Sequence, residues 1–144
     1  MEVPSDLPNR IADSLEAHQQ CFIHKRTLEI ISYPEEYLLD LDPGQNVWQE
    51  DIEKVESDPN YIQIEAMPSN DLFDVMEEFA NSVSDRSVKT RLLNALNGRK
   101  PFAHFKYQIE NTAHFRDLWF ECRRAKNIEW VTTQINGILT ENKP

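Results

Sequence analysis

Residues 92–106 read LLNALNGRKPFAHFK, and this stretch decides the fold because it predicts two helices joined by a short connection. Leucines recur in its first part at the helical spacing, and Gly98 is expected to end that helix in the left-handed conformation that favours glycine. Pro101 then begins the next helix, since proline is tolerated in a first turn. Arg99 and Lys100 are therefore expected at a joint between two helices.

The chain on both sides of this joint also has helical patterns. Upstream, residues 68–71 supply a helix start, and apolar residues follow at the helical spacing through residue 83. Downstream, a long helix or a helix pair is predicted from about residue 113 to residue 138. The part of the chain from about 69 to 138 is therefore predicted to be helical.

The first part of the chain predicts a small antiparallel sheet. Residues 21–24 and 28–32 are two short apolar runs that indicate a hairpin, and residues 61–66 alternate at the strand period as a third strand. The turn at residues 25–27 lacks Gly and Asn, so we expect a connection of three residues or a more open one. A helix from about residue 6 to residue 18 precedes the hairpin.

The stretch from residue 33 to residue 58 is acidic and interrupted by proline, with one short helix predicted over residues 49–56. The whole sequence thus predicts an α+β fold in which helix dominates: about three strands with four or five helices. With 144 residues, the chain is expected to form a single domain over 1–144, in which the first helix, the hairpin and the third strand occupy about residues 6–66.

Composition excludes several classes of protein. Hydrophobic residues make 40% and charged residues 28%, as in globular proteins. Cys21 and Cys122 lie far apart and no signal segment is visible, so we expect a reducing, cytoplasmic location. The longest apolar runs are a few residues, far below the roughly 20 that span a bilayer, so no membrane segment is predicted.

The net charge of −10 is unevenly distributed along the chain. Residues 1–85 hold 20 acidic and 4 basic residues, whereas residues 86–144 hold 5 acidic and 11 basic residues. Two interpretations are open: the two halves neutralise each other or cover opposite solvated faces, or the basic half offers a face to an anionic partner. In the second case the acidic half would repel non-specific nucleic acid.

Residues 92–106, followed by FRDLWF at residues 115–120, resemble the bacterial uncharacterised protein family 0158. Its members share a leucine-rich helix, Ala-Leu-x-Gly-Arg, Phe-x-x-Phe-Lys and a later helix with Trp-Phe or Trp-x-x-Phe. The resemblance covers about residues 6–130, but the family commonly has Thr-Gly at the hairpin turn, where this chain has Lys25-Arg26-Thr27. The resemblance implies the fold and implies no activity, cofactor or catalytic residue.

The joint at residues 98–106 is the strongest candidate site. Arg99 and Lys100 lie beside a helix N-terminus whose free N–H groups attract anions, so the joint could hold a phosphate or a carboxylate. In the alternative interpretation Gly98 is only a helix cap, Arg99 bonds to carbonyls or to an acidic neighbour, and Phe102 and Phe105 are core residues.

No catalytic residue, metal site or cofactor is predicted. His18, Cys21 and His24 include metal-ligand types, but on a strand Cys21 and His24 point to opposite faces, so Cys21 is interpreted as a core residue. Arginines at positions 123 and 124 could lower the pKa of an exposed Cys122 thiol, although burial on the Trp119 face is favoured. No nucleophile motif is present.

The aromatic residues of the basic half could stack nucleic-acid bases, but their helical spacing favours a core or a dimer face. They are Phe102, Phe105, Tyr107, Phe115, Trp119, Phe120 and Trp130.

These observations favour a non-enzymatic cytoplasmic interaction or regulatory module with an acidic protein partner or with itself as partner. Its binding residues are predicted to be Arg99, Lys100, His104, Lys106, Arg116 and Arg123. A first alternative is a nucleic-acid-binding regulator, which would also use Arg124 and Lys126 on one exposed face. A second is a small enzyme with a carboxylate beside His104 or His114 in a deep pocket.

Overall fold

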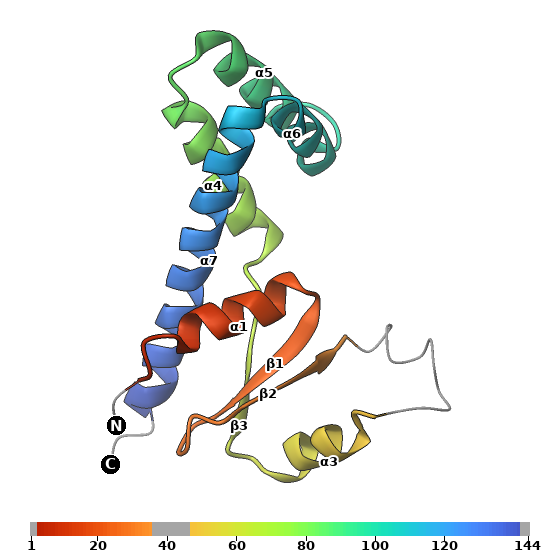
Figure 1. Ribbon diagram of the computed structural model, residues 1–144, viewed down its shortest axis with the longest axis vertical. Helices are drawn as coiled ribbons and strands as arrows, with labels where there is room; N and C mark the ends of the chain where they lie inside the picture. The colour runs from red at the N-terminus through yellow and green to blue at the C-terminus, as the bar shows by residue number, and fades with distance from the viewer. Residues whose placement is uncertain (1–2, 36–46, 142–144) are drawn as a thin grey trace. The chain divides into compact units, whose positions relative to one another are not determined.

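The computed structural model describes residues 3–35 and 47–141 (Figure 1). It confirms the predicted α+β fold, in which helix dominates and three strands form an antiparallel sheet. In chain order the elements are α1 (Leu7–Glu16), β1 (Gln19–His24), β2 (Ile30–Pro34), α3 (Gln49–Ser57), β3 (Tyr61–Ile64), α4 (Ser69–Ser82), α5 (Arg86–Leu96), α6 (Pro101–Glu110) and α7 (Ala113–Glu141).

The described residues group into two compact units. The sheet unit is drawn from Met1–Ala66 and Ile128–Pro144, and the helical unit is Met67–Asn127. The long helix α7 contributes its last part to the sheet unit and its first part to the helical unit. The single domain over 1–144 stays a prediction, and the helical part predicted over 69–138 is shared between the units.

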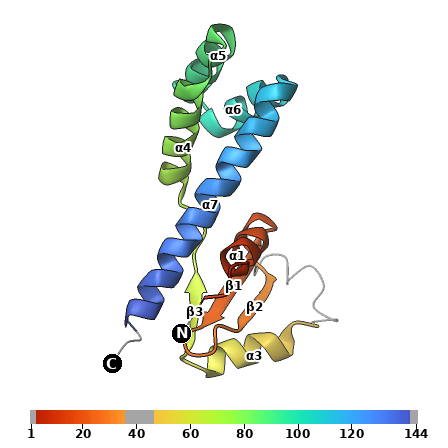
Figure 2. The same ribbon diagram turned by 60° about the vertical axis from the view of Figure 1, so that its left-hand side comes forward.

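The sheet has the strand order β2-β1-β3, with both neighbours of β1 antiparallel to it. Side chains alternate between its two faces, as the strand period requires. Figure 2 shows α1 on one side of the sheet and α3 on the other. One face packs with α1 and the end of α7 around Cys21, Ile23 and Ile64, which confirms Cys21 as a core residue.

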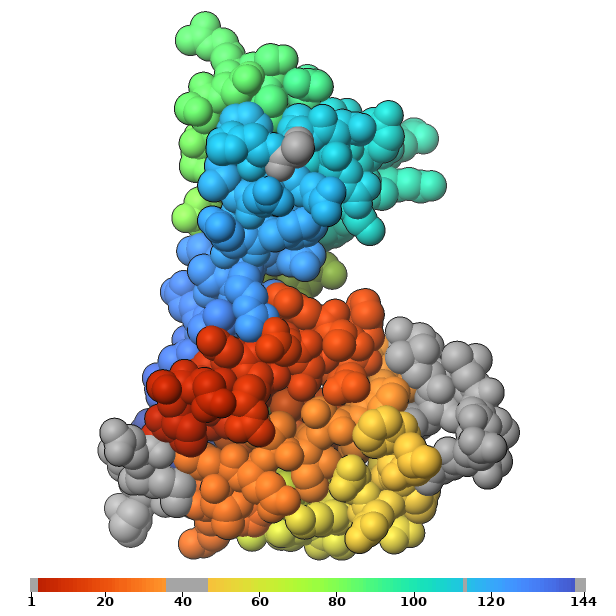
Figure 3. All heavy atoms as spheres, viewed as in Figure 1, coloured from red at the N-terminus to blue at the C-terminus, as the bar shows by residue number. Residues whose placement is uncertain are grey.

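The second face of the sheet packs with α3. Tyr33 and Tyr61 are buried there, and Ile52 and Val55 of α3 lie against them. In the space-filling view the atoms of α3 lie against those of the hairpin (Figure 3). The short helix predicted over 49–56 is therefore present, whereas residues 36–46 of the acidic stretch lie outside the described residues.

The hairpin turn is open, as predicted, but the second strand begins at Ile30 and not at residue 28. Leu28 has φ 63°, in the left-handed region, and its N–H donates to the carbonyl of His24 at 2.8 Å. A left-handed residue cannot continue a strand, so the ladder resumes only where the His24 N–H donates to the Glu29 carbonyl at 2.9 Å. His18, with φ 60°, similarly separates α1 from β1, so α1 ends at Glu16.

The end of β3 is held by side chains of α7 within the sheet unit. The Gln134 amide accepts from the Glu65 N–H at 3.0 Å and donates to the Glu65 carbonyl at 2.8 Å. The indole N–H of Trp130 donates to the same carbonyl at 3.0 Å. Trp130 therefore anchors the end of a strand. This role differs from the two roles considered for it in the sequence analysis, which were base stacking and a position in a core or dimer face.

The core of the helical unit gathers around Trp119 of α7. Its ring lies 5.3 Å from the ring of Phe79 in α4 and 5.0 Å from that of Phe105 in α6, measured between centroids. Leu92 and Leu96 of α5 complete this core, as the leucine spacing predicts. Phe105 is fully buried, but Phe102 is 36% exposed, so only one of the two phenylalanines is a core residue.

We predict that Phe105→Ala lowers the free energy of unfolding by about 3–5 kcal/mol, because removing a fully buried ring leaves a cavity. The matched control is Phe102→Ala, the same change on an exposed residue of the same helix, for which we expect a loss of about 1 kcal/mol. Urea denaturation followed by circular dichroism measures both values. Equal losses of unfolding free energy in the two variants would contradict the difference in burial between Phe105 and Phe102.

Candidate functional site

The joint between α5 and α6 does not turn where the sequence suggested. Gly98 has no positive φ, and Lys100 instead occupies the left-handed region with φ 48° and ψ 58°. Pro101 disfavours the right-handed helical conformation at the residue before it, so the change of direction falls on Lys100. The expectation that Gly98 ends the helix in the left-handed conformation is therefore wrong.

The predicted cations of the joint are all exposed. Arg99 and Lys100 lie in the connection, and His104 and Lys106 lie on the outer side of α6. Among the described residues, no carboxylate pairs with any of these four side chains. The interpretation in which Arg99 is tied to an acidic neighbour therefore has no support in the described part of the chain.

The two remaining predicted residues, Arg116 and Arg123, meet at one aromatic ring. Their guanidinium carbons each lie 5.5 Å from the ring centroid of Phe120. The distance between the two guanidinium carbons is therefore at most twice 5.5 Å. On a helix, positions four before and three after Phe120 share its side, which explains the arrangement. Each cation–π contact at such an exposed site contributes about 0.5–1 kcal/mol.

This Arg–Phe–Arg cluster, formed by Arg116, Phe120 and Arg123, lies next to the core without joining it. Phe120 is 40% exposed, whereas the preceding Trp119 is 3% exposed. The ring of Phe120 thus keeps apolar surface in water, and the two arginines have no carboxylate partner within the described residues. An exposed aromatic ring between unpaired cations is a surface that an anionic partner can cover.

The structure brings the predicted site residues into two groups. Arg116 and Arg123 share a ring, and Arg99 and Lys100 are neighbours in the chain, but no described contact joins these two pairs. Lys126, from the larger nucleic-acid set, pairs with Glu78 at 3.7 Å, and Arg124 also has an interaction. The cations available to a partner are therefore fewer than the sequence suggested.

Charge differs sharply between the units when all residues of each are counted. The ranges of the sheet unit contain 17 acidic and 5 basic residues, a net charge of −12, whereas the helical unit contains 8 and 10, a net charge of +2. Within the helical unit the basic residues concentrate in 86–127, with 10 basic against 3 acidic residues. Among the described residues of this unit, Lys126 pairs with Glu78 and Arg124 also has an interaction, whereas Arg99, Lys100, Lys106, Arg116 and Arg123 pair with no carboxylate.

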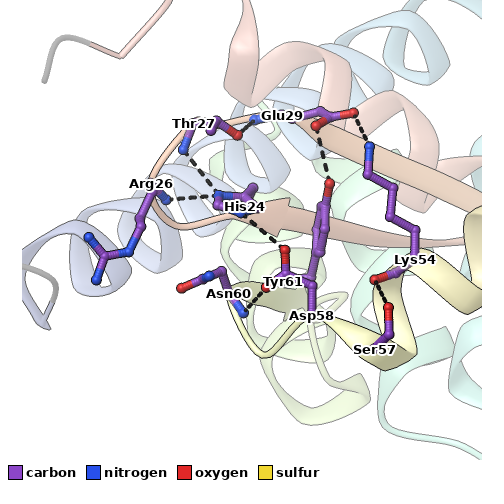
Figure 4. A network of polar contacts seen from close by, with 9 residues as sticks. All are labelled: His24, Arg26, Thr27, Glu29, Lys54, Ser57, Asp58, Asn60 and Tyr61. Atoms are coloured by element: carbon purple, nitrogen blue, oxygen red, sulfur yellow. Dashed lines mark hydrogen bonds and ion pairs between the residues drawn. The ribbon is translucent and has the colours of Figure 1, made fainter.

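A polar network that the sequence analysis missed ties the hairpin turn to the end of α3 (Figure 4). His24 Nδ1 accepts hydrogen bonds from the backbone N–H groups of Arg26 and Thr27 at 3.2 and 3.1 Å. A nitrogen that accepts two such bonds carries no proton, so the proton resides on Nε2, which faces Asp58 Oδ2 at 3.4 Å.

The same network contains a second carboxylate. Glu29 accepts from Lys54 Nζ at 3.0 Å and from the Tyr61 hydroxyl at 3.1 Å. The hydrogen bond from Lys54 lowers the pKa of Glu29 from its ordinary 4.5, and burial raises the pKa of Tyr61 from its ordinary 10.0. The backbone N–H of Asn60 lowers the pKa of Asp58 from its ordinary 3.8.

These contacts hold the hairpin turn between β1 and β2 in place. The pKa values of both carboxylates, Glu29 and Asp58, are lowered, which favours their charged forms, and the Tyr61 hydroxyl donates to Glu29. The Asp58-Pro59-Asn60 sequence is a turn signal that could have indicated one end of this network. The pairing of Glu29 with Lys54 across 25 positions left no such signal.

Other residues that could carry chemistry do not assemble within the described chain. Burial raises the pKa of Cys21 to about 11 and also raises that of the partly buried Cys122, so neither thiol is activated, and Cys122 packs on the Trp119 core as favoured. Neither His104 nor His114 pairs with a carboxylate there. Within residues 3–35 and 47–141, no helix has the length and apolarity needed to cross a membrane.

A protein-family model matches most of the chain. The model of a family described as "Uncharacterised protein family (UPF0158)" matches residues 10–142, which confirms the resemblance seen at residues 92–120. No curated protein and no solved structure matches the chain.

We predict that Gly98→Ala leaves stability unchanged or raises it by up to about 1 kcal/mol, because Gly98 has no positive φ and a Cβ there would lie at an ordinary 3.5 Å from the Asn94 carbonyl oxygen. Lys100→Gly should stabilise by about 1 kcal/mol by relieving the left-handed lysine. Thermal unfolding measures both. A strongly destabilised Gly98→Ala variant would mean that Gly98, and not Lys100, makes the turn.

We predict that Glu29→Gln reduces the loss of stability in acid. Because the folded-state pKa of Glu29 lies below 4.5, its bonds stabilise the fold above that pH, and this contribution is lost as the pH falls through the folded value. The midpoint of thermal unfolding should thus fall less steeply below pH 4.5 in the variant than in the wild type. Glu50→Gln, which removes an exposed carboxylate of α3, should keep the wild-type slope.

Proposed function

Because the chain belongs to the uncharacterised protein family UPF0158, whose description states no activity, we propose its function from the helical unit: it binds an acidic protein segment at the Arg–Phe–Arg cluster. The observation that carries the proposal is the placement of Arg116 and Arg123 on the exposed ring of Phe120. The chain is then an interaction module whose activity is recognition.

The chemistry of the cluster suits a protein partner. Arginine and aromatic residues are the types that concentrate binding energy at protein interfaces, because they combine apolar area with hydrogen bonds. Arginine also binds carboxylates through two parallel N–H donors. A segment with two carboxylates flanking an apolar side chain would place a carboxylate on each guanidinium and cover the ring of Phe120.

The residues of the joint take a supporting part in the proposal. Arg99, Lys100, His104 and Lys106 are exposed, and they extend the positive potential of the helical unit beyond the cluster. Exposed cations of this kind mainly speed the approach of an acidic partner and fix its orientation. Their removal should therefore weaken binding less than removal of the cluster.

Nucleic acid is the second candidate, because an exposed ring beside arginines is also the platform on which bases stack. The overall charge favours a protein partner. A polyanion must approach a chain with a net charge of −10, and Lys126, one of the cations it would use, is already paired with Glu78. A compact acidic segment needs only the local cluster.

We predict that a fluorescein-labelled peptide of glutamates around a central tyrosine binds the wild type, and that Arg116→Ala/Arg123→Ala weakens this binding at least tenfold, about 1.4 kcal/mol. Fluorescence anisotropy in low salt measures the dissociation constants, and binding should weaken as salt is added. Arg99→Ala/Lys100→Ala should weaken it only about threefold, since these cations mainly steer.

The matched control removes the same charge from another exposed part of the helical unit. Arg86→Ala/Arg91→Ala on α5 should change the dissociation constant no more than about twofold, because those arginines lie outside the cluster. Circular dichroism confirms that every variant is folded. If the control variant weakens binding equally, the loss comes from the change in net charge and not from the cluster, and the proposal is wrong. If a labelled oligothymidine binds more tightly than the peptide, the partner is nucleic acid and not protein.

A further inference from the structure

We infer that the acidic partner is the sheet unit of a second copy of this chain, which presents the outer side of α3 to the Arg–Phe–Arg cluster. This inference rests on the proposed function and specifies the partner. It starts from charge: the ranges of the sheet unit carry −12, while residues 86–127 of the helical unit carry 10 basic against 3 acidic residues. Two copies therefore hold complementary surfaces.

The outer side of α3 is the part of the sheet unit best suited to this contact. Glu50, Glu53 and Glu56 are exposed, while the apolar residues of the helix pack against the sheet. Lys54, the helix's one cation, is held by Glu29 at 3.0 Å. The helix thus shows carboxylates to the solvent with little neutralising charge of its own.

The axial spacing of the carboxylates is close to that of the arginines. Glu50 and Glu56 are six residues apart on α3, about 9 Å along the axis and about 120° around it, and Arg116 and Arg123 are seven apart on α7, about 10.5 Å along the axis and about 20° around it. Because Glu50 and Glu56 flank Glu53 on either side, α3 would face the cluster with Glu53 at the centre, and the long arginine side chains would reach outward to the two flanking carboxylates. Between them Glu53, already fixed by the Gln49 amide at 3.0 Å, would place its methylene groups over Phe120.

This contact joins two different surfaces, so it is heterologous. One copy uses its acidic side and the other its basic side, and each copy keeps one unused side. The association must therefore grow with protein concentration and weaken with salt, because it depends on exposed charges. The heterologous contact also predicts that a variant without the basic side binds a variant without the acidic side.

The experiment uses two charge-neutralised variants of the full chain. Arg116→Ala/Arg123→Ala removes the basic side, and Glu50→Gln/Glu56→Gln removes the acidic side while it keeps the bond between Gln49 and Glu53. Sedimentation equilibrium in low salt should show self-association of the wild type and a monomer for each variant alone. An equimolar mixture of the two variants should form a complex of one copy of each.

Glu129→Gln/Glu141→Gln is the matched control, since it neutralises two exposed carboxylates of α7 in the sheet unit and should associate like the wild type. Circular dichroism checks the fold of each variant. A wild type that stays monomeric, variants that still associate alone, or monomeric variants that form no mixed complex would each overturn the inference. If the wild type still binds the acidic peptide, the proposed function then stands with another partner, and if it does not, both fall.

Discussion

The packing of Trp119 between Phe79 and Phe105 is the interaction on which the rest of the helical unit depends. It joins α4, α6 and α7 at one indole, and it fixes the rotation of α7 about its own axis. Once Trp119 faces the core, the helical period places Phe120 at the edge of the exposed side, with an arginine one turn before and one turn after it. The candidate site is thus a consequence of the core.

Much of this arrangement could be predicted from local patterns. The helical spacing of the leucines before Gly98, the two runs of the hairpin and the alternation in β3 each indicated the right type of element, because the apolar period is a property of a few neighbouring residues. The burial of Cys21 followed in the same way. The exposure of Arg116 was also predictable, but its meeting with the half-buried Arg123 at one ring was not.

The parts that the sequence did not reveal depend on competition between neighbours or on distant contacts. Gly98 was the natural residue for a left-handed turn, yet the constraint that Pro101 imposes on its predecessor placed that conformation on Lys100. Phe102 and Phe105 have the same chemistry, and only the tertiary packing leaves the first exposed. The network of His24, Glu29 and Lys54 joins residues whose proximity no local pattern indicates.

The hydrogen bonds of Trp130 and Gln134 to the backbone of Glu65 have a consequence for aggregation. With the strand order β2-β1-β3, β3 is an edge strand, and the backbone groups of such strands can recruit strands from other chains into open-ended aggregates. At the end of β3 the polar backbone groups of Glu65 are instead occupied by two side chains of the same molecule. The protein thereby guards one end of its sheet against edge-to-edge pairing without a proline, a bulge or an inward-pointing charge at that residue.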